Sequence, residues 1–327
     1  WICLIWKLNY PLLPFIEFQM AEDRKENLLP LEKIIQNFSR INKKLRTDGL
    51  RPTIARKVEK IYQNLKRDGL RYAIVRVIMG MLFLREKDAI RDARRKVLNT
   101  LLAQHNSKVG YGPFKGMKLN SNTWWGKFDL ISKILGVYEE HVLKKICGFI
   151  EIVDGPFVDI GAADGYFAVG MAFGGHCDEV LAYEISPTGR ESLLANIKEN
   201  NCEDRVSVAE EADYKSLKKL VNTRGSAVIL IDIEGAEYDL LSNDVLELLK
   251  NCYVICELHP FFVDHGTEKE EVLINNAKRV FNVSCIQRDY YNPNHFSELD
   301  DFSDEERLLA FSEGRPKNMK WLVLEPK

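Results

Sequence analysis

The sequence predicts an α/β protein built on a doubly wound, mostly parallel sheet. Three apolar runs with an acidic residue at or near their carboxyl ends indicate this class: residues 157–160, 180–183 and 227–231. Continuous apolar runs are typical of parallel strands that are buried on both faces. A glycine-containing turn and an apolar segment at 166–173 follow the first run, as at the first corner of a Rossmann-like sheet. We therefore expect a Rossmann-like sheet of seven strands, preceded by a helical region.

The turn at residues 158–165 is expected to hold a ligand. Its glycines let the backbone reverse tightly and approach a ligand closely, but Ala163 stands where a dinucleotide site prefers glycine for contact with pyrophosphate. The Asp159 carboxylate repels phosphate and attracts an amine. Both features favour S-adenosylmethionine, which has an ammonium and a sulfonium but no phosphate, although any tight strand-to-helix turn is an alternative. The expected contacts are Asp159, Gly161, Ala162, Ala163, Gly165 and Tyr166.

The second apolar run ends at Glu184, which follows Gly165 by 19 residues. This is close to the spacing at which an acid meets the ribose hydroxyls of a bound nucleoside. A carboxylate accepts several hydrogen bonds and can hold both hydroxyls. We therefore expect Glu184 and the adjacent Ile185 to contact the cofactor, although a solvated glutamate at a strand end gives the same pattern. Pro187 fits the first turn of a helix over residues 188–200.

Further strands are expected at 206–208, 253–260, 283–287 and 321–324, of which the strand at 253–260 delivers Glu257 and His259 to the ligand edge. The loop after the first of these contains Glu211, and because Rossmann-like sites commonly contact adenine there, we expect its carboxylate to accept a hydrogen bond from the exocyclic amine. A solvated acidic loop is the alternative. Residues 289–319 are long, polar and aromatic, and loops of this length are commonly functional. We expect a substrate-facing insertion there.

Four segments together resemble the FkbM-type family of S-adenosylmethionine-dependent methyltransferases. They are residues 157–167, 183–187 with Asn196, 231–237 and 256–259, which match in order and spacing. The Asp-x-Glu-Gly-Ala-Glu segment that starts at Asp232 is the most diagnostic, and Asp164 stands where the family usually has Asn. The resemblance covers the chain from about residue 150 onwards. It implies methyl transfer, often to the oxygen of a glycan or another small hydroxylated acceptor.

The ends of the fourth and fifth strands carry the candidate catalytic residues. A hydroxyl nucleophile benefits from a base, and His259 has an intrinsic pKa near neutral pH. We expect His259 to act as the base, Asp232 to orient the reacting groups beside the cofactor, and Glu234 to be the next candidate. Glu234 and Glu237 also fit the start of a helix, where acids are favoured. By spacing, no third ligand accompanies Asp232 and Glu234, so no metal is expected.

The chain before residue 151 divides by composition. Residues 1–20 form an apolar leader that is neither a clear membrane span nor a signal peptide. Residues 21–110 form a basic helical region with 22 Lys and Arg against 10 Asp and Glu. Residues 111–150 are expected to form a hairpin and helices that lead into the S-adenosylmethionine-binding domain at 151–327.

The basic region leaves two other classes of function open. Its charge favours an anionic partner, although solvated helix faces explain it equally. One alternative is a nucleic-acid- or lipid-binding protein with a catalytically weak Rossmann domain, and another is an NAD-dependent oxidoreductase on the same sheet. The seven cysteines show no metal-binding spacing and are expected to be reduced thiols of a cytoplasmic protein.

Overall fold

The computed structural model describes residues 89–120 and 129–327, except 289, 290, 314 and 316. The chain divides into two units, Trp1–Ala89 and Ile90–Lys327, and the second contains nearly all of the described residues. The expected leader and most of the basic helical region therefore lie outside the described residues. The part of that region that is described begins with one helix over residues 89–104.

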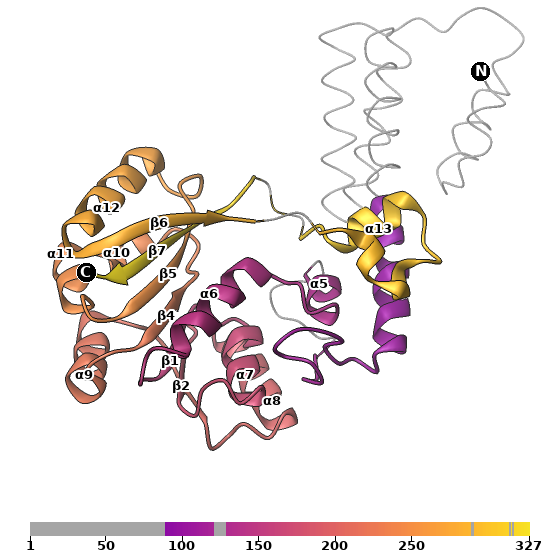
Figure 1. Cartoon of the computed structure of the whole chain (residues 1–327), viewed down its shortest axis with the longest axis horizontal. Coiled ribbons are helices and arrows are strands. Elements are labelled where there is room, and N and C mark those ends of the chain that lie inside the picture. The colour runs from indigo at the N-terminus through magenta and orange to yellow at the C-terminus, as the bar shows by residue number, and fades with distance from the viewer. Residues whose placement is uncertain (1–88, 121–128, 289–290, 314, 316) are drawn as a thin grey trace, which may run out of the picture. The chain divides into compact units, whose positions relative to one another are not determined.

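A seven-stranded sheet forms the centre of the second unit, in the order β3-β2-β1-β4-β5-β7-β6 (Figure 1). Strands β1 to β5 are parallel, whereas β7 runs antiparallel to both of its neighbours, β5 and β6. The predicted Rossmann-like fold class is thereby confirmed. The strands are β1 (Phe157–Ile160), β2 (Val180–Tyr183), β3 (Val206–Ala209), β4 (Val228–Ile231), β5 (Tyr253–Leu258), β6 (Phe281–Gln287) and β7 (Lys320–Pro326).

Helices cover both faces of the sheet. One face packs on α6, α7 and α8 and buries Phe157 and Val228, and the other packs on α9, α11 and α12 and buries Val158 and Ile229. Because neighbouring residues of one strand enter opposite cores, the strands form continuous apolar runs instead of alternating with polar residues. The helices are α5 (Leu130–Ile134), α6 (Glu140–Ile150), α7 (Tyr166–Phe173), α8 (Pro187–Glu199), α9 (Tyr214–Arg224), α10 (Glu237–Leu240), α11 (Asn243–Leu248), α12 (Gly266–Val280) and α13 (Asp304–Ala310).

Residues 105–120 form a looped lead-in in which the chain reverses and pairs with itself, Val109 N–H with Met117 O at 2.9 Å and Leu119 N–H with Ser107 O at 2.7 Å, without forming the two expected strands. One isolated antiparallel bridge joins Lys108 to Lys118. Between them, Gly112 and Gly116 adopt φ values of 73° and 92°, which turn the chain out of a regular ladder. The helices predicted after this segment are present as α5 and α6.

The segment between β6 and β7 leaves the sheet at the carboxyl ends of the parallel strands, because Gln287 and Leu258 both pair with Lys320. It contains two short 3-10 helices and α13. It packs with α5 and the helix of residues 89–104 in a separate apolar core (Figure 1). The described part of residues 289–319 is therefore a folded insertion beside the predicted ligand edge.

The sequence also predicts reduced cysteines and no clear membrane span. The six cysteines among the described residues are free thiols. Across the same residues, no helix combines the length and the apolar character that a membrane span requires.

Candidate active site

The parallel strands β2, β1, β4 and β5 lie side by side and end at one edge of the sheet. Ile160 of β1 pairs with Tyr183 of β2 and with Ile231 of β4, so the residues that follow these strands start level with one another. Glu184 after β2 and Asp232 after β4 therefore flank the start of the glycine turn. This edge is where an open α/β sheet binds its ligand.

The turn after β1 adopts a left-handed backbone conformation at three positions. The φ values are 91° at Gly161, 49° at Ala163 and 87° at Gly165. A Cβ atom at Gly161 would lie 1.8 Å from the backbone oxygen of Asp232, so only glycine allows β1 and β4 to approach here. Ala163 adopts its conformation without that freedom, at a cost of about 1 kcal/mol. Such local strain is typical of ligand-binding turns.

Asp159 lies beneath this turn and is 2% exposed. Its Oδ2 accepts a hydrogen bond from the backbone N–H of Ala168 in α7 at 3.1 Å. Burial raises the pKa of Asp159 to about 7, although the Ala168 N–H opposes the rise. Because Oδ2 is occupied by this hydrogen bond, the other oxygen of Asp159, Oδ1, is the atom that remains for the predicted contact with a cofactor amine.

Glu184 closes the turn from the side of β2. Its Oε2 accepts a hydrogen bond from Ala163 N–H at 2.8 Å, and its Oε1 accepts one from Ser186 N–H at 2.7 Å. The residue is 5% exposed, yet each oxygen keeps a lone pair for a ribose hydroxyl. The structure adds a role that the spacing did not suggest, because Glu184 holds the glycine turn in shape.

The other predicted cofactor residues differ in exposure. Ile185 is 71% exposed at the end of β2 and offers an apolar surface. Glu211 is exposed in the loop after β3. Ala162 and Tyr166 are buried, and the Tyr166 ring packs edge-on against Phe114. The fold therefore gathers most of these residues at one edge but presents only some of them to solvent.

A cleft beside the turn is lined by residues 117–120 and by parts of α5, α7 and α8. Lys133 Nζ lies there 3.2 Å from Oδ1 of Asp164, and both side chains are about nine-tenths buried. Among the described residues, the Tyr166 hydroxyl and Oδ1 of Asn196 have no hydrogen-bond partner. Both residues line the cleft, so two orphaned polar groups stand beside the glycine turn.

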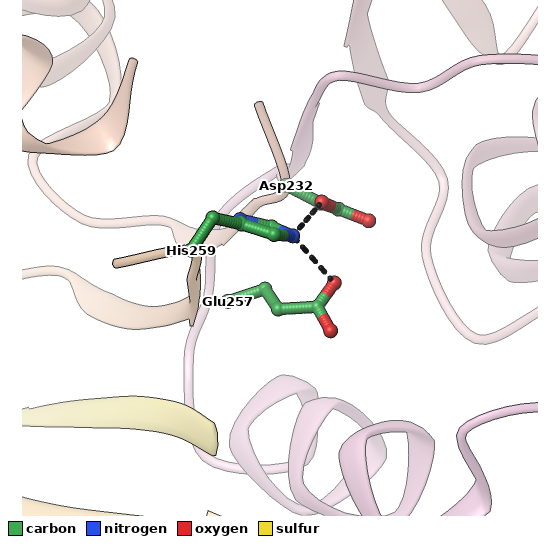
Figure 2. A group of neighbouring side chains, drawn as sticks. All are labelled: Asp232, Glu257 and His259. Carbon is green, nitrogen blue, oxygen red and sulfur yellow. Dashed lines mark ion pairs between the residues drawn. The ribbon is translucent and has the colours of Figure 1, made fainter. Parts of the chain in front are cut away.

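A cluster of acids surrounds His259 at the ends of β4 and β5 (Figure 2). Its Nε2 lies 3.6 Å from Oδ1 of Asp232 and 3.6 Å from Oε2 of Glu257. The same nitrogen lies 3.4 Å from Oε2 of Glu234. The His259 side chain is 2% exposed, whereas those of Asp232 and Glu234 are 27% and 37% exposed. The cluster therefore opens to solvent on the side of these two acids.

Burial and mutual repulsion shift the pKa values of this cluster. Burial raises the pKa of Asp232, opposed by the charge of His259. Burial and the Asp232 charge together raise the pKa of Glu234, and they raise that of Glu257 well above its ordinary value. Burial alone would lower the pKa of His259, but its hydrogen bond to Glu237 and the nearby carboxylates raise it. The cluster is therefore short of positive charge.

Glu237 supports the cluster from inside the protein, where it is 0% exposed. Its Oε2 accepts the Gly235 N–H at 2.7 Å, and its Oε1 accepts the His259 N–H at 2.7 Å. Burial would raise the pKa of Glu237, but the hydrogen bonds with His259 lower it overall. Glu237 lies in the first turn of α10, as the helix-start alternative expects, although no side chain makes a cap hydrogen bond there.

Arg315 connects the insertion with the cluster. Its Nη1 donates to Oε1 of Glu257, and its Nη2 donates to Oε1 of Glu139. Its Nε donates to Oε2 of Glu313 at 2.8 Å. All three glutamates are buried, so one guanidinium balances carboxylates from β5, from the start of α6 and from the insertion itself.

Sequence reasoning brought Glu257 to the same edge as His259 but gave it no role, and it left Arg315 out of the candidate site. Glu257 precedes His259 by two residues near the end of a strand, where alternate positions share a face, and this signal favours a shared role. Arg315 lies 58 residues from Glu257 in a long insertion, and a single sequence contains no signal for that pairing. Spacing along the sequence gave Asp232 no further ligand, whereas the fold places one ligand atom each of Asp232, Glu257 and His259 within 4.8 Å of one another.

No protein-family model matches the chain, and no curated protein matches it in sequence. Among solved structures, the B. subtilis M1A22 tRNA methyltransferase TrmK is similar at 13% identity and a TM-score of 0.38, covering 57% of this chain and 65% of its own. Precorrin-6y C5,15-methyltransferase from Geobacter metallireducens is similar at 13% identity and a TM-score of 0.39, covering 57% and 88%. Spermidine synthase from Thermotoga maritima is similar at 12% identity and a TM-score of 0.39, covering 56% and 57%. At these identities and scores the likenesses are in fold alone.

Proposed function

We propose that the protein is an S-adenosylmethionine-dependent methyltransferase of the FkbM type that methylates an oxygen of a hydroxylated acceptor, such as a glycan or another small molecule. The observation that carries this proposal is the convergence of the glycine turn, Glu184 and Asp232 at the ends of three adjacent strands. Ala163 replaces the second glycine of a G-x-G-x-x-G turn, the one that lets the backbone approach pyrophosphate, and two carboxylates flank the turn. Both features suit a cationic nucleoside without phosphate better than a dinucleotide.

The residues present fit S-adenosylmethionine. Glu184 keeps free lone pairs for ribose hydroxyls, and the exposed side chain of Ile185 offers an apolar face for the adenine ring. The orphaned polar atoms of Tyr166 and Asn196 suit the ammonium and carboxylate of the methionine end. When bound, the cofactor supplies an activated methyl group for in-line transfer to a nucleophile.

The acidic cluster suits activation of an acceptor hydroxyl. In the transfer, a bond forms between the acceptor oxygen and the methyl carbon, the carbon–sulfur bond breaks, and the hydroxyl proton passes to a base. A base must reach that proton directly or through one water. Glu234 is 37% exposed and stands at the open side of the cluster, whereas His259 is 2% exposed behind it. We therefore assign the base role to Glu234 and a positioning role to His259, in contrast to the choice made from intrinsic pKa alone.

A transfer assay with methyl-labelled S-adenosylmethionine tests this function. Incubation with panels of sugars, phenols, lipids, peptides and RNA should give label in a hydroxylated acceptor. Glu234→Gln should lower kcat by about 100-fold, the usual scale for loss of a general base, while affinity for S-adenosylhomocysteine stays unchanged. The exposed Asp244 provides a matched control, and Asp244→Asn should retain full activity. Label found only on nitrogen, or none in any class, would contradict the proposed reaction.

A further inference from the structure

The distances around His259 do not suit a set of hydrogen bonds. Its Nε2 lies 3.6 Å from Asp232 and 3.6 Å from Glu257, both beyond the usual range of about 2.7–3.2 Å for an N–H···O bond (Figure 2). The carboxylate of Glu234 stands 3.4 Å from the same nitrogen. One imidazole nitrogen thus faces three carboxylates that surround it without any close contact.

A buried polar atom without a partner marks the same place independently. The Oδ1 atom of Asp232 is buried, has no hydrogen-bond partner among the described residues, and faces Nε2 of His259. The His259 side chain is 98% buried, because only 2% of it is exposed, and its other ring nitrogen, Nδ1, faces Glu237. A buried polar atom without a partner costs about 1–3 kcal/mol. An unpartnered oxygen opposite a buried imidazole nitrogen indicates a missing ligand between them.

We propose that a divalent transition-metal ion binds between Asp232, Glu257 and His259. Nitrogen and oxygen ligands about 2.0–2.2 Å from a tetrahedral ion stand roughly 3.3–3.6 Å from each other. The two distances of 3.6 Å from His259 Nε2, to Asp232 and to Glu257, match this separation between ligand atoms. All three ligand atoms lie within 4.8 Å of one another, so small side-chain adjustments complete the set.

The charge of the cluster favours a cation. Asp232, Glu234, Glu237 and Glu257 all lie within 3.6 Å of the His259 ring nitrogens. Arg315, the guanidinium that pairs with Glu257, is shared with the buried Glu139 and Glu313. A metal ion between the acids therefore supplies charge that these side chains lack. One imidazole with two carboxylates suits Mn²⁺ or Zn²⁺ better than Mg²⁺ or Ca²⁺, which prefer oxygen ligands alone.

The residues behind the ligands already hold them in the orientation that a metal needs. Oε1 of Glu237 lies 3.4 Å from Nδ1 of His259, and the two Glu237 oxygens are fixed by backbone N–H groups at 2.7 Å. A carboxylate behind the distal ring nitrogen is the usual support of a metal-binding histidine. Arg315 binds Oε1 of Glu257 and leaves Oε2 toward His259. Glu237 therefore orients His259, and Arg315 orients Glu257.

The metal gives the proposed transfer a specific step, and this part of the inference rests on the proposed function. The open side of the cluster, at Asp232 and Glu234, leaves a coordination position for the acceptor oxygen. A bound cation lowers the pKa of a coordinated hydroxyl, so its proton passes to the adjacent Glu234 as the oxygen–methyl bond forms. The site would then select acceptors that present a hydroxyl to the metal.

The full-length protein, stripped with a chelator and dialysed, provides the test without any turnover. Titration with MnCl2, followed by electron paramagnetic resonance, should show one bound Mn²⁺ per chain and hyperfine coupling to one histidine nitrogen. ZnCl2 should compete with it, and MgCl2 should bind more weakly. Asp232→Asn should weaken Mn²⁺ binding by at least 10-fold. The exposed control Asp244→Asn should leave it unchanged.

Two results would overturn the site: no stoichiometric Mn²⁺ binding to the wild-type protein, or binding without nitrogen coupling. The wild-type spectrum keeps the test decisive even where Asp232→Asn does not fold. Calorimetry of the stripped protein with S-adenosylhomocysteine separates this inference from the proposed function. Cofactor binding without metal binding removes the metal site alone, and metal binding without cofactor binding removes the methyltransferase assignment and keeps the site.

Discussion

The carboxylate of Glu237 accepts the backbone N–H of His259 across 2.7 Å. This bond ties the turn after β4 to the end of β5, two segments that contribute the acids of the candidate site. The second oxygen of Glu237 holds Gly235 N–H at the same distance of 2.7 Å. A single buried side chain therefore sets the spacing between the two halves of the acidic cluster.

We expect Glu237→Ala to destabilise the fold by about 3 kcal/mol, because it leaves two buried N–H groups unpaired at about 1–3 kcal/mol each. Glu237→Gln keeps one acceptor and should be less harmful than the alanine variant. Urea denaturation of the three proteins measures the difference in the free energy of unfolding. An alanine variant within about 0.5 kcal/mol of wild type would show that the two bonds do not hold the turn.

We expect Arg315→Ala to destabilise the fold by about 3 kcal/mol, since removal of one partner leaves buried carboxylates without a counter-charge. Those carboxylates belong to Glu139, Glu257 and Glu313. The control is Arg307, which pairs with the exposed Asp304. Because exposed pairs contribute about 0–1 kcal/mol, Arg307→Ala should change the thermal midpoint little. Equal effects of the two substitutions would contradict the anchoring role of Arg315.

We expect Glu184→Ala to weaken binding of S-adenosylhomocysteine by at least 10-fold, which corresponds to about 1.4 kcal/mol. The substitution removes an acceptor for the ribose hydroxyls and also frees the N–H groups of Ala163 and Ser186. Glu191 on α8 is exposed and serves as the control for charge. Calorimetric titration should give wild-type affinity for Glu191→Ala, and unchanged affinity in Glu184→Ala would refute the ribose role.

Asp159 should make the stability of the protein depend on pH. Burial raises its pKa to about 7 in the folded protein, whereas the unfolded chain releases this proton near pH 4. The folded state therefore holds more protons between these values. The contribution of Asp159 to the free energy of unfolding is therefore fully present below about pH 4. It is lost as pH rises through about 7, by on the order of 4 kcal/mol.

Asp159→Asn removes this titration and keeps an oxygen for the Ala168 N–H. The difference in unfolding free energy between the two proteins, measured by urea denaturation from pH 4 to pH 8, isolates the contribution of Asp159. Wild type should lose stability relative to the variant across this range. A constant difference would mean that Asp159 ionises normally in the fold.

The strands were predictable because a parallel strand buried on both faces must be apolar throughout, as Val228–Ile231 is. Glu184 and Asp232 were predictable because acids directly after such strands end at one edge of the sheet. The lead-in reverses as a hairpin does, but Gly112 and Gly116 at positive φ interrupt it, so it pairs at one isolated bridge instead of forming two strands.

The acidic cluster shows where a single sequence stops being informative. Spacing alone gave Asp232 and Glu234 no third ligand, because Glu257 and His259 belong to another strand and join them only when β4 and β5 pair. The burial of His259 behind those acids was equally hidden, so intrinsic pKa alone favoured His259 as the base, a role that we propose for Glu234. Arg315 reaches the cluster from an insertion whose path no local pattern describes.

Calorimetric titration of the full-length protein with S-adenosylhomocysteine and, separately, with NAD decides whether the glycine turn binds a nucleoside thioether or a dinucleotide. We expect one binding site per chain for the nucleoside thioether, with an affinity that falls at least 10-fold in Glu184→Ala, and no saturable binding of NAD. Saturable binding of NAD with no heat from S-adenosylhomocysteine would contradict this expectation.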